Sequence, residues 1–216
     1  MPKFAAAIFD MDGLMLDTER PSMRAWKQAA SEQGFSISDA VFSRTMGVSE
    51  SICRQVYADE FGGCFPYEEI RKRAMLVLNH EFERNGIALC PGLIPLFDHL
   101  AKLNTPLAIA TSTHMKRALW KLEKAGLKGL FSAFAFGDEV ERGKPAPDIF
   151  LLAAQRLGKN PADCIGFEDS PPGLLGLHAA GIHSVFVKSL IEPRPEILSK
   201  VWRRCADLAA AVEFIE

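Results

Sequence analysis

The chain has 216 residues, of which 48% are hydrophobic and 24% charged, and its formal net charge at pH 7 is -2. This length fits one large domain, or a core with a smaller inserted or appended domain, and either can bury a substantial core. The small net charge argues against a surface that coats nucleic acid, and the apolar content argues against intrinsic disorder. A small molecule is therefore the expected partner, and a monomer is the expected state.

The cysteines and the hydropathy pattern bear on the cellular compartment. Five cysteines are scattered along the chain without a CxxC spacing, which argues against a disulfide framework or a structural zinc site. The first apolar run is too short for a signal peptide and is interrupted by Asp10 and Asp12, and no later run reaches transmembrane length. We expect reduced, mostly buried cysteines in a cytoplasmic protein that does not bind membranes.

Two acidic residues follow the first apolar run. Phe4 to Phe9 has the length of a strand, Asp10 and Asp12 come next, and Gly13 allows a sharp turn. Residues two apart share a face of an extended chain, so on a continuing strand both carboxylates would point the same way. Two such charges repel by about 4 kcal/mol at about 4 Å and an effective dielectric near 20. A cation is expected between them, and we expect Mg²⁺.

Helical patterns dominate from about Arg20 to about Asn85. Apolar residues recur at helical spacing, Ser38 and Ser49 are suited to cap two helices, and a longer helix is expected from about Pro66. The segment therefore predicts an insert of roughly four helices.

Strands and helices alternate from about Pro91 onward. Strands are expected at Leu107 to Thr111, Ala133 to Phe136, Cys164 to Glu168, Ser184 to Val187 and near Arg204 and Cys205. Helices are expected at Leu93 to Leu103, Met115 to Ala125, Pro147 to Leu157 and from Ser170-Pro171 to Gly181, with a terminal helix capped by Asp207.

This alternation predicts an α/β fold, a doubly wound parallel sheet with right-handed crossovers and helices on both faces. The expected core comprises residues 1–17 and 88–216, and the inserted all-helical cap comprises residues 18–87.

Polar side chains gather where the strands end, which is where doubly wound sheets bind ligands. The first strand ends in Asp10 and Asp12, the next in Thr111-Ser112-Thr113, and a later one in Glu168-Asp169-Ser170, while Lys144 lies in a loop. Carboxylates suit Mg²⁺, and hydroxyl groups with a lysine suit phosphate oxygens. The set predicts a site for a phosphoryl group and its metal.

Four segments carry a resemblance to a known family: DMDGLMLDTE, the TS after a strand, GKPAPDIF and GFEDSPPG. In this order they resemble the motifs of the haloacid dehalogenase-like (HAD) hydrolase superfamily, over nearly the whole chain and with the cap in the same place. The chain is most similar to the β-phosphoglucomutase-like branch, which includes sugar-phosphate phosphatases and pseudouridine-5'-phosphatase.

The resemblance implies a Mg²⁺-dependent phosphatase that hydrolyses a small phosphomonoester, namely a sugar, polyol or nucleoside monophosphate. It implies that Asp10 attacks phosphorus to form an aspartyl phosphate, and that Asp12 protonates the leaving oxygen and then activates water. Asp10, the backbone carbonyl of Asp12 and Asp169 would bind the metal, with Glu168 helping directly or through water. Thr111, Ser112 and Lys144 would hold the phosphoryl oxygens.

Several neighbouring residues have two interpretations each. Asp17 and Thr18 either form the N-cap of the first helix of the cap domain or act as the hinge that lets the cap domain close. Glu19 either contacts substrate hydroxyls or complements the dipole of that helix. Asp148 either orients Lys144 or caps the following helix. Gly47, Ser49 and His114 are further candidates for substrate contact, while Trp26 is expected in the core.

Two other functions are weighed against hydrolysis. In the related mutases a histidine stands where this chain has Ser22, and an arginine that grips a second phosphate stands where it has Glu50. We therefore expect hydrolysis of a substrate with one phosphate, with a β-phosphoglucomutase-type mutase as the alternative. A catalytically silent binding protein of the same fold is the alternative from another class. A phosphonate hydrolase would use a cap lysine, but Lys27 is expected to be an exposed helix residue.

Overall fold

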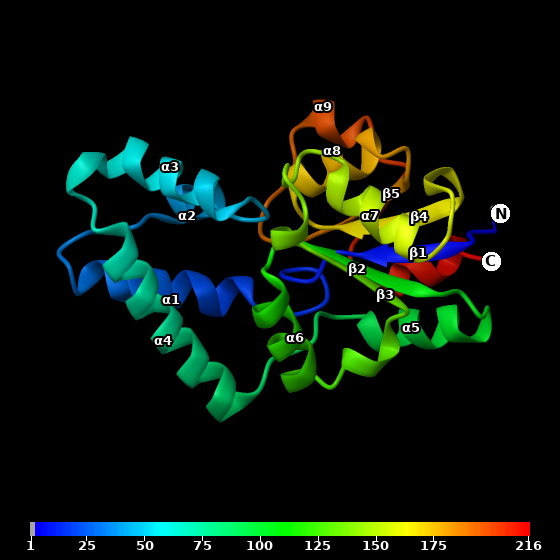
Figure 1. Ribbon diagram of the computed structural model, residues 1–216, viewed down its shortest axis with the longest axis horizontal. Coiled ribbons are helices and arrows are strands. Elements are labelled where there is room, and N and C mark those ends of the chain that lie inside the picture. Colours follow the sequence, from blue (N-terminus) through cyan, green and yellow to red (C-terminus); the bar gives the residue numbers. More distant parts are fainter. Residues whose placement is uncertain (1–2) are drawn as a thin grey trace.

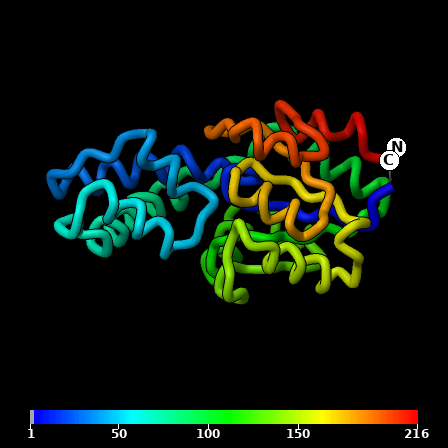
Figure 2. The backbone as a smooth tube through the Cα atoms, turned by 90° about the horizontal axis from the view of Figure 1, so that it is seen from above, coloured from blue at the N-terminus to red at the C-terminus, as the bar shows by residue number. Residues whose placement is uncertain are grey.

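The computed structural model describes residues 3–216, so Met1 and Pro2, the first residues of the expected core, lie outside the described residues. The chain forms a sheet with helices on both faces and, beside it, a lobe of helices (Figure 1). The view from above shows the same two parts next to each other along the long axis (Figure 2). The expected α/β core with an inserted helical cap is confirmed.

The sheet described within residues 3–216 has six strands in the order β3-β2-β1-β4-β5-β6. Every neighbouring pair is parallel, as predicted for a doubly wound sheet. The strand bounds are β1 Ala6–Phe9, β2 Leu107–Thr111, β3 Ala133–Phe136, β4 Cys164–Glu168, β5 His183–Val187 and β6 Arg203–Cys205. The sequence predicted these strands to within one or two residues.

Alternation along β1 divides the core between the two faces of the sheet. Ala7 and Phe9 belong to one cluster of buried apolar residues. Ala6 and Ile8 belong to a second cluster, which contains Phe150. The period-2 direction of strand side chains explains this division. Helices α5 (Leu93–Lys102) and α6 (Met115–Lys124) cover one face, and α7 (Asp148–Arg156) and α8 (Pro171–Ala179) cover the other (Figure 1).

Four α-helices form the cap, in agreement with the prediction. They are α1 Glu19–Ser31, α2 Asp39–Ser43, α3 Glu50–Phe61 and α4 Tyr67–Asn85. Ser38 caps α2 as expected, since its hydroxyl accepts a hydrogen bond of 3.2 Å from the amide of Val41. Ser49 occupies the N-cap position of α3, but among the described residues its side chain makes no capping bond and lies 2.9 Å from the hydroxyl of Ser51.

The two chain segments that join cap and core run side by side. The amide of Asp17 donates to the carbonyl of Ala88 at 2.9 Å, and the amide of Cys90 donates to the carbonyl of Met15 at 2.8 Å. The backbone therefore ties the entrance of the cap to its exit directly below α1.

Several short elements were not predicted. These are the helix α9 Pro195–Leu198 and the 3-10 helices η1 Gly62–Cys64, η2 Lys128–Leu130, η3 Gly137–Glu139 and η4 Pro161–Asp163. The expected terminal helix is a 3-10 helix, η5 Ala209–Phe214. The carboxylate of Asp207 accepts a hydrogen bond from the amide of Ala210, the second residue of this helix.

The cysteines agree with the sequence in part. All five are free thiols, and Cys164 and Cys205 are buried, whereas Cys64 is exposed. The expectation of mostly buried cysteines is therefore wrong for Cys64, which sits in a short 3-10 turn of the cap. None of the helices described is long and apolar enough to cross a membrane.

Candidate active site

Three central strands bring the predicted site residues together. β1 lies between β2 and β4, and Phe9 is in register with Ile109 on one side and Phe167 on the other. All three strands are parallel, so they end at the same edge of the sheet. Asp10 therefore emerges between Thr111 and Glu168, although these residues lie far apart in the sequence.

A buried acidic cluster occupies this edge. Ligand atoms of Asp10, Glu168 and Asp169 all lie within 4.8 Å of one another, and all three residues are buried. Burial raises the pKa of Asp10 well above its usual value, and the charges of Glu168 and Asp169 add to this effect against the opposing charge of Lys144. Burial, and then the charge of Glu168, likewise raises the pKa of Asp169.

Lys144 neutralises part of this charge. Its side chain is 1% exposed, and its ammonium group contacts Asp10 and lies 2.5 Å from Oε1 of Glu168. Burial opposes a charged lysine, but the attraction of Asp10 and Glu168 outweighs it and raises the pKa of Lys144. The lysine stays charged. Because this single cation faces three carboxylates, the cluster can accommodate a second cation.

The Glu168 carboxylate is fixed by the turn that follows β4. Its Oε2 accepts hydrogen bonds from the amides of Asp169 and Ser170, at 3.1 and 3.0 Å, and from the Ser170 hydroxyl at 2.9 Å. Gly173, in the first turn of α8, leaves space for this carboxylate, since a Cβ there would lie 1.9 Å from Glu168 Cδ. A close backbone approach of this kind requires glycine.

The acidic cluster fits a divalent metal. Oδ1 of Asp169 is buried and, among the atoms of residues 3–216, has no hydrogen-bond partner. Buried polar atoms are normally paired, so an unpaired carboxylate oxygen in an acidic cluster is suited to a cation. Carboxylate oxygens are the ligands that Mg²⁺ prefers. Asp10, Glu168 and Asp169 are the residues that would hold it.

Asp12 has different partners from Asp10. Its Oδ1 accepts hydrogen bonds from the Thr18 hydroxyl at 2.6 Å and from the Lys121 ammonium at 2.5 Å, and its Oδ2 accepts from the Thr113 hydroxyl at 2.7 Å. Burial alone would raise the pKa of Asp12, but the charge and hydrogen bond of Lys121, with the two hydroxyl groups, lower it. The chain leaves strand geometry after Phe9, and Gly13 turns it with φ of 85°. The two carboxylates therefore have separate surroundings.

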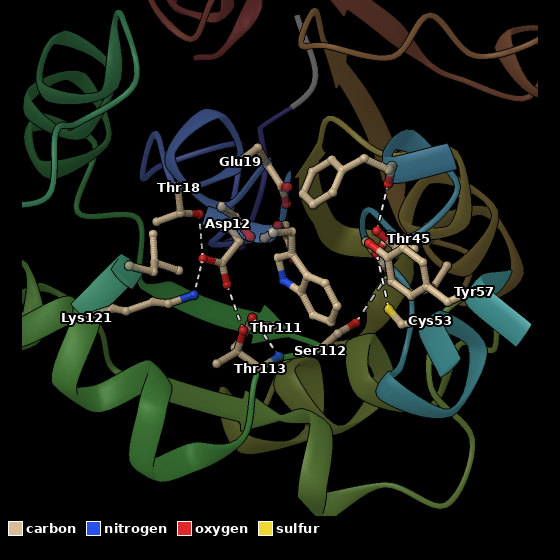
Figure 3. Close-up of a pocket in the computed structure, with 17 residues that line it drawn as sticks. Asp12, Thr18, Glu19, Thr45, Cys53, Tyr57, Thr111, Ser112, Thr113 and Lys121 are labelled. Carbon is tan, nitrogen blue, oxygen red and sulfur yellow. Dashed lines mark hydrogen bonds and ion pairs between the residues drawn. The ribbon is translucent and has the colours of Figure 1, made fainter. Parts of the chain in front are cut away.

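Asp10 and Asp12 nevertheless line one cavity between the sheet edge and the cap (Figure 3). Its volume is about 220 Å³. The core contributes Asp10, Asp12, Thr111, Ser112, Thr113 and Lys121, and the chain from Thr18 through the cap contributes Thr18, Glu19, Ser22, Trp26, Phe42, Thr45, Gly47, Val48, Cys53, Tyr57 and Leu78.

The remaining predicted site residues divide into two groups. Glu19, Gly47 and Ser112 line the cavity, and the hydroxyl of Ser112 lies 3.5 Å from the carbonyl of Gly47, so core and cap meet there. Ser49 and His114 do not line it, and the His114 side chain is 68% exposed beside Asp138.

Asp148 is the first residue of α7, but Pro147 holds the N-cap position without a side-chain capping bond, so the interpretation of Asp148 as the helix cap is wrong. Its carboxylate does not orient Lys144 either. It accepts hydrogen bonds of 3.1 and 3.0 Å from the Arg142 guanidinium instead. Thr18 is at the N-cap position of α1, yet its hydroxyl binds Asp12 rather than the helix backbone.

Glu50 and Lys27, the cap residues that bear on the mutase and phosphonate hydrolase alternatives, also have partners outside the cavity. Glu50 accepts hydrogen bonds from Arg71 at 2.7 Å and from Arg54 at 3.3 Å and does not line the cavity. The comparison with the mutases therefore depends on the missing arginine and not on a direct contact of Glu50 with substrate in the cavity. Lys27 pairs with Asp39 on the cap surface.

Sequence reasoning missed several contributors to the cavity wall. Lys121 lies on the apolar stripe of α6 with Ala118 and Leu122, and a lysine on such a stripe is a signal that could have identified it. Thr113 belongs to the hydroxyl cluster expected after β2, but its hydrogen bond to Asp12 was not anticipated. Trp26 was assigned to the core, and it does stack on Tyr57 at 5.0 Å, but both rings also line the cavity.

Comparisons with known proteins identify the family of this chain. A sequence model of haloacid dehalogenase-like hydrolases matches residues 4–181. A phosphorylated carbohydrates phosphatase of Thermotoga maritima is 31% identical over 84% of this chain and 83% of its own length. Hexitol phosphatase A of Escherichia coli is 34% identical over 84% of this chain and 82% of its own.

A solved structure has the same fold. The β-phosphoglucomutase of Clostridium difficile superposes with a TM-score of 0.76 at 26% identity, covering 96% of this chain and 92% of that protein. The matched residues 4–181 make up most of the chain, and the acidic cluster and the Asp12 network lie within this range. The chain belongs to the haloacid dehalogenase-like hydrolase family.

Proposed function

We propose that this protein is a Mg²⁺-dependent phosphatase that hydrolyses a small phosphomonoester through an aspartyl phosphate on Asp10. One observation carries the proposal. Asp10 and Asp12 line the same cavity, yet Asp10 is bound to Lys144 within an acidic cluster, whereas Asp12 is bound to Lys121 and two hydroxyl groups. Two carboxyl groups in different environments are suited to different roles in one reaction.

In the first step, a carboxylate oxygen of Asp10 attacks phosphorus and the ester P–O bond breaks. Asp12 gives a proton to the leaving oxygen, which departs as an alcohol. The Lys144 ammonium, buried against Asp10, is placed to balance negative charge on the phosphoryl oxygens. Thr111 is buried at the end of β2, and its hydroxyl accepts a hydrogen bond of 3.1 Å from the amide of Thr113.

In the second step, Asp12 takes a proton from water, and the resulting hydroxide attacks phosphorus and releases phosphate from Asp10. An ionised carboxylate is needed for this step, and the lowered pKa of Asp12 favours that form, whereas the same lowered pKa opposes the protonated form that the first step needs. Mg²⁺ held by Asp10, Glu168 and Asp169 would supply charge neutralisation for the phosphoryl group.

The relatives support a phosphatase rather than a mutase or a silent binding protein. Two of them, at 31% and 34% identity, are phosphatases of phosphorylated carbohydrates and hexitols by name. Ser22, which replaces the histidine of the mutases, lines the cavity. A catalytically silent domain would be expected to have lost part of the Asp10, Asp12 and Lys144 arrangement.

The test is phosphate release from p-nitrophenyl phosphate with Mg²⁺. Asp10→Asn and Asp12→Asn are each expected to reduce kcat by at least about 10²-fold, while Asp148→Asn, whose partner is the exposed Arg142, serves as the matched control. Activity that survives in Asp10→Asn would overturn the aspartyl phosphate. Formation of glucose 6-phosphate from β-glucose 1-phosphate in place of free phosphate would indicate a mutase.

A further inference from the structure

The first residue of α6 is fixed by a side chain from outside the helix. His114 occupies the N-cap position of α6, but within residues 3–216 its side chain makes no capping hydrogen bond. Asp138, 23 residues further along the chain than Met115, supplies the cap, because its Oδ1 accepts a hydrogen bond of 2.8 Å from the amide of Met115. Its Oδ2 lies 3.7 Å from Nδ1 of His114. The start of α6 is therefore attached to η3, the turn that follows β3.

The same turn supports the loop between β2 and α6. The amide of Gly137 donates a hydrogen bond of 3.2 Å to the carbonyl of Thr113. A Cβ on Gly137 would lie 2.1 Å from the carbonyl oxygen of Ser112, so this close approach of two backbones requires glycine. Ser112, Thr113 and Met115 therefore all contact η3.

The turn η3 is in turn held by α7. Glu139 accepts hydrogen bonds of 2.8 and 2.9 Å from the guanidinium of Arg156 and one of 3.0 Å from the amide of Phe136. Arg156 also donates to the carbonyl of Phe134 at 2.5 Å. A bidentate pair fixes the orientation of both groups, so η3 is anchored to β3 and to α7.

The segment that η3 supports carries two of the partners of Asp12. The Thr113 hydroxyl, just before α6, lies 2.7 Å from Asp12 Oδ2, and the Lys121 ammonium, in the second turn of α6, lies 2.5 Å from Oδ1. The helix has ten residues, and its backbone hydrogen bonds join the first turn to the second. A displacement of the start of α6 therefore moves both partners of Asp12 together.

We propose that Asp138 is a positioning residue for proton transfer by Asp12. Asp138 does not line the cavity between the sheet edge and the cap, so it acts through α6 and not by contact with substrate. Its carboxylate fixes the start of α6, and the helix then holds Thr113 and Lys121 against Asp12. The proposal rests on the proposed function, in which Asp12 gives a proton to the leaving oxygen.

The leaving group distinguishes this role from a general loss of structure. Phenolate is a stronger base than p-nitrophenolate, so phenyl phosphate depends more on a proton from Asp12 than p-nitrophenyl phosphate does. Asp138→Ala should reduce kcat/KM for phenyl phosphate at least about fivefold, the size of a lost helix cap. The ratio of the two kcat/KM values should change by at least about threefold, because the aryl ester with the better leaving group loses less.

Two matched variants show whether the hydrogen bond is the cause. Asp138→Asn keeps an oxygen acceptor and should restore kcat/KM for phenyl phosphate to within about twofold of the wild type. Glu123→Ala removes an acid of α6 that is 71% exposed and pairs with Lys128, and it should leave the ratio unchanged. A loss in Asp138→Asn as large as that in Asp138→Ala would overturn the assignment to the hydrogen bond.

A proline variant removes the same bond from its other partner. Met115 is the first residue of α6 and is 38% exposed, and His114 before it has φ of -58° and ψ of 144°, a conformation that a following proline accepts. Met115→Pro lacks the amide that Asp138 binds, so it should change the ratio as Asp138→Ala does, and the double variant should lose no more. It also replaces Asp138→Ala in the test if that variant melts below the assay temperature.

The outcomes separate this inference from the proposed function. If the wild type hydrolyses both esters but the ratio changes by less than threefold in Asp138→Ala or Met115→Pro, or if their losses multiply in the double variant, the inference fails and the phosphatase stands. If the wild type releases no phosphate from either ester with Mg²⁺ present, the proposed function itself fails.

Discussion

Replacement of Lys121 by methionine removes the ammonium group that binds Asp12 and keeps most of the side-chain volume. Lys121 is 8% exposed, and its hydrogen bond to Asp12 Oδ1 is 2.5 Å long. Thr18 and Thr113 remain as donors to Asp12, so the carboxylate keeps two of its three partners. We expect Asp12 to lose its fixed orientation without the fold being lost.

The magnitude follows from the bond that is removed. A hydrogen bond to a charged group contributes about 1.5–3 kcal/mol, which corresponds to a reduction of about 10- to 150-fold in kcat if the orientation is needed in the transition state. KM should change little, because Asp12 acts on the leaving oxygen rather than on the bound phosphate. Lys121→Arg should restore part of kcat, since it retains the charge.

The assay is steady-state hydrolysis of p-nitrophenyl phosphate with Mg²⁺, together with thermal unfolding. Lys116→Met, an exposed position on the same helix, is the matched control. A Lys121→Met enzyme with kcat within twofold of the wild type and an unchanged melting temperature would refute the reasoning, because Asp12 would then be oriented without the lysine.

Three further predictions concern the acidic side of the site. Gly173→Ala places a Cβ 1.9 Å from Glu168 Cδ and should reduce stability by about 1–3 kcal/mol and abolish most activity, whereas Gly129→Ala, with nothing within 4 Å, should be close to wild type in thermal unfolding. Mg²⁺ should raise the melting temperature of EDTA-treated protein, and Asp169→Asn should reduce that rise; an equal rise in both proteins would place the metal elsewhere. In metal-free protein the pKa of Glu19 is about 8, compared with its usual 4.5. Between pH 4.5 and pH 8 the folded state therefore keeps a proton that the unfolded state releases. The free energy of unfolding should fall as the pH rises through this range. Glu19→Gln should therefore be more stable than the wild type by about 2–3 kcal/mol at pH 8.5, after allowance for solvent screening, and not at pH 4.5; unfolding curves that coincide at both pH values would contradict this.

The sequence alone was sufficient for the sheet and for the acidic cluster. Short apolar runs alternate with amphipathic helices, which permits little besides a parallel sheet with helices on both faces. Polar residues placed just after such strands must meet at one edge, so Asp10, Thr111, Glu168 and Asp169 were expected together, and the structure brings them together.

The tertiary structure alone decided what surrounds Asp12. Lys121 is 109 residues away from Asp12 in the sequence, and Thr113 is 101 residues away. No local pattern relates a helix position to a carboxylate at that distance, because the contact depends on how α6 is rotated and where it packs beneath the sheet edge.

The cap shows the same division. Its helices follow from periodicity, but the side chains that face the cavity depend on how the lobe is set against the core, and Ser49 was a candidate for substrate contact although it lies outside the lining. Strand positions follow from short apolar runs that repeat along the chain, so sequence patterns predict them well. The contact between two lobes depends on side chains that meet only once, and only the folded chain shows which ones they are.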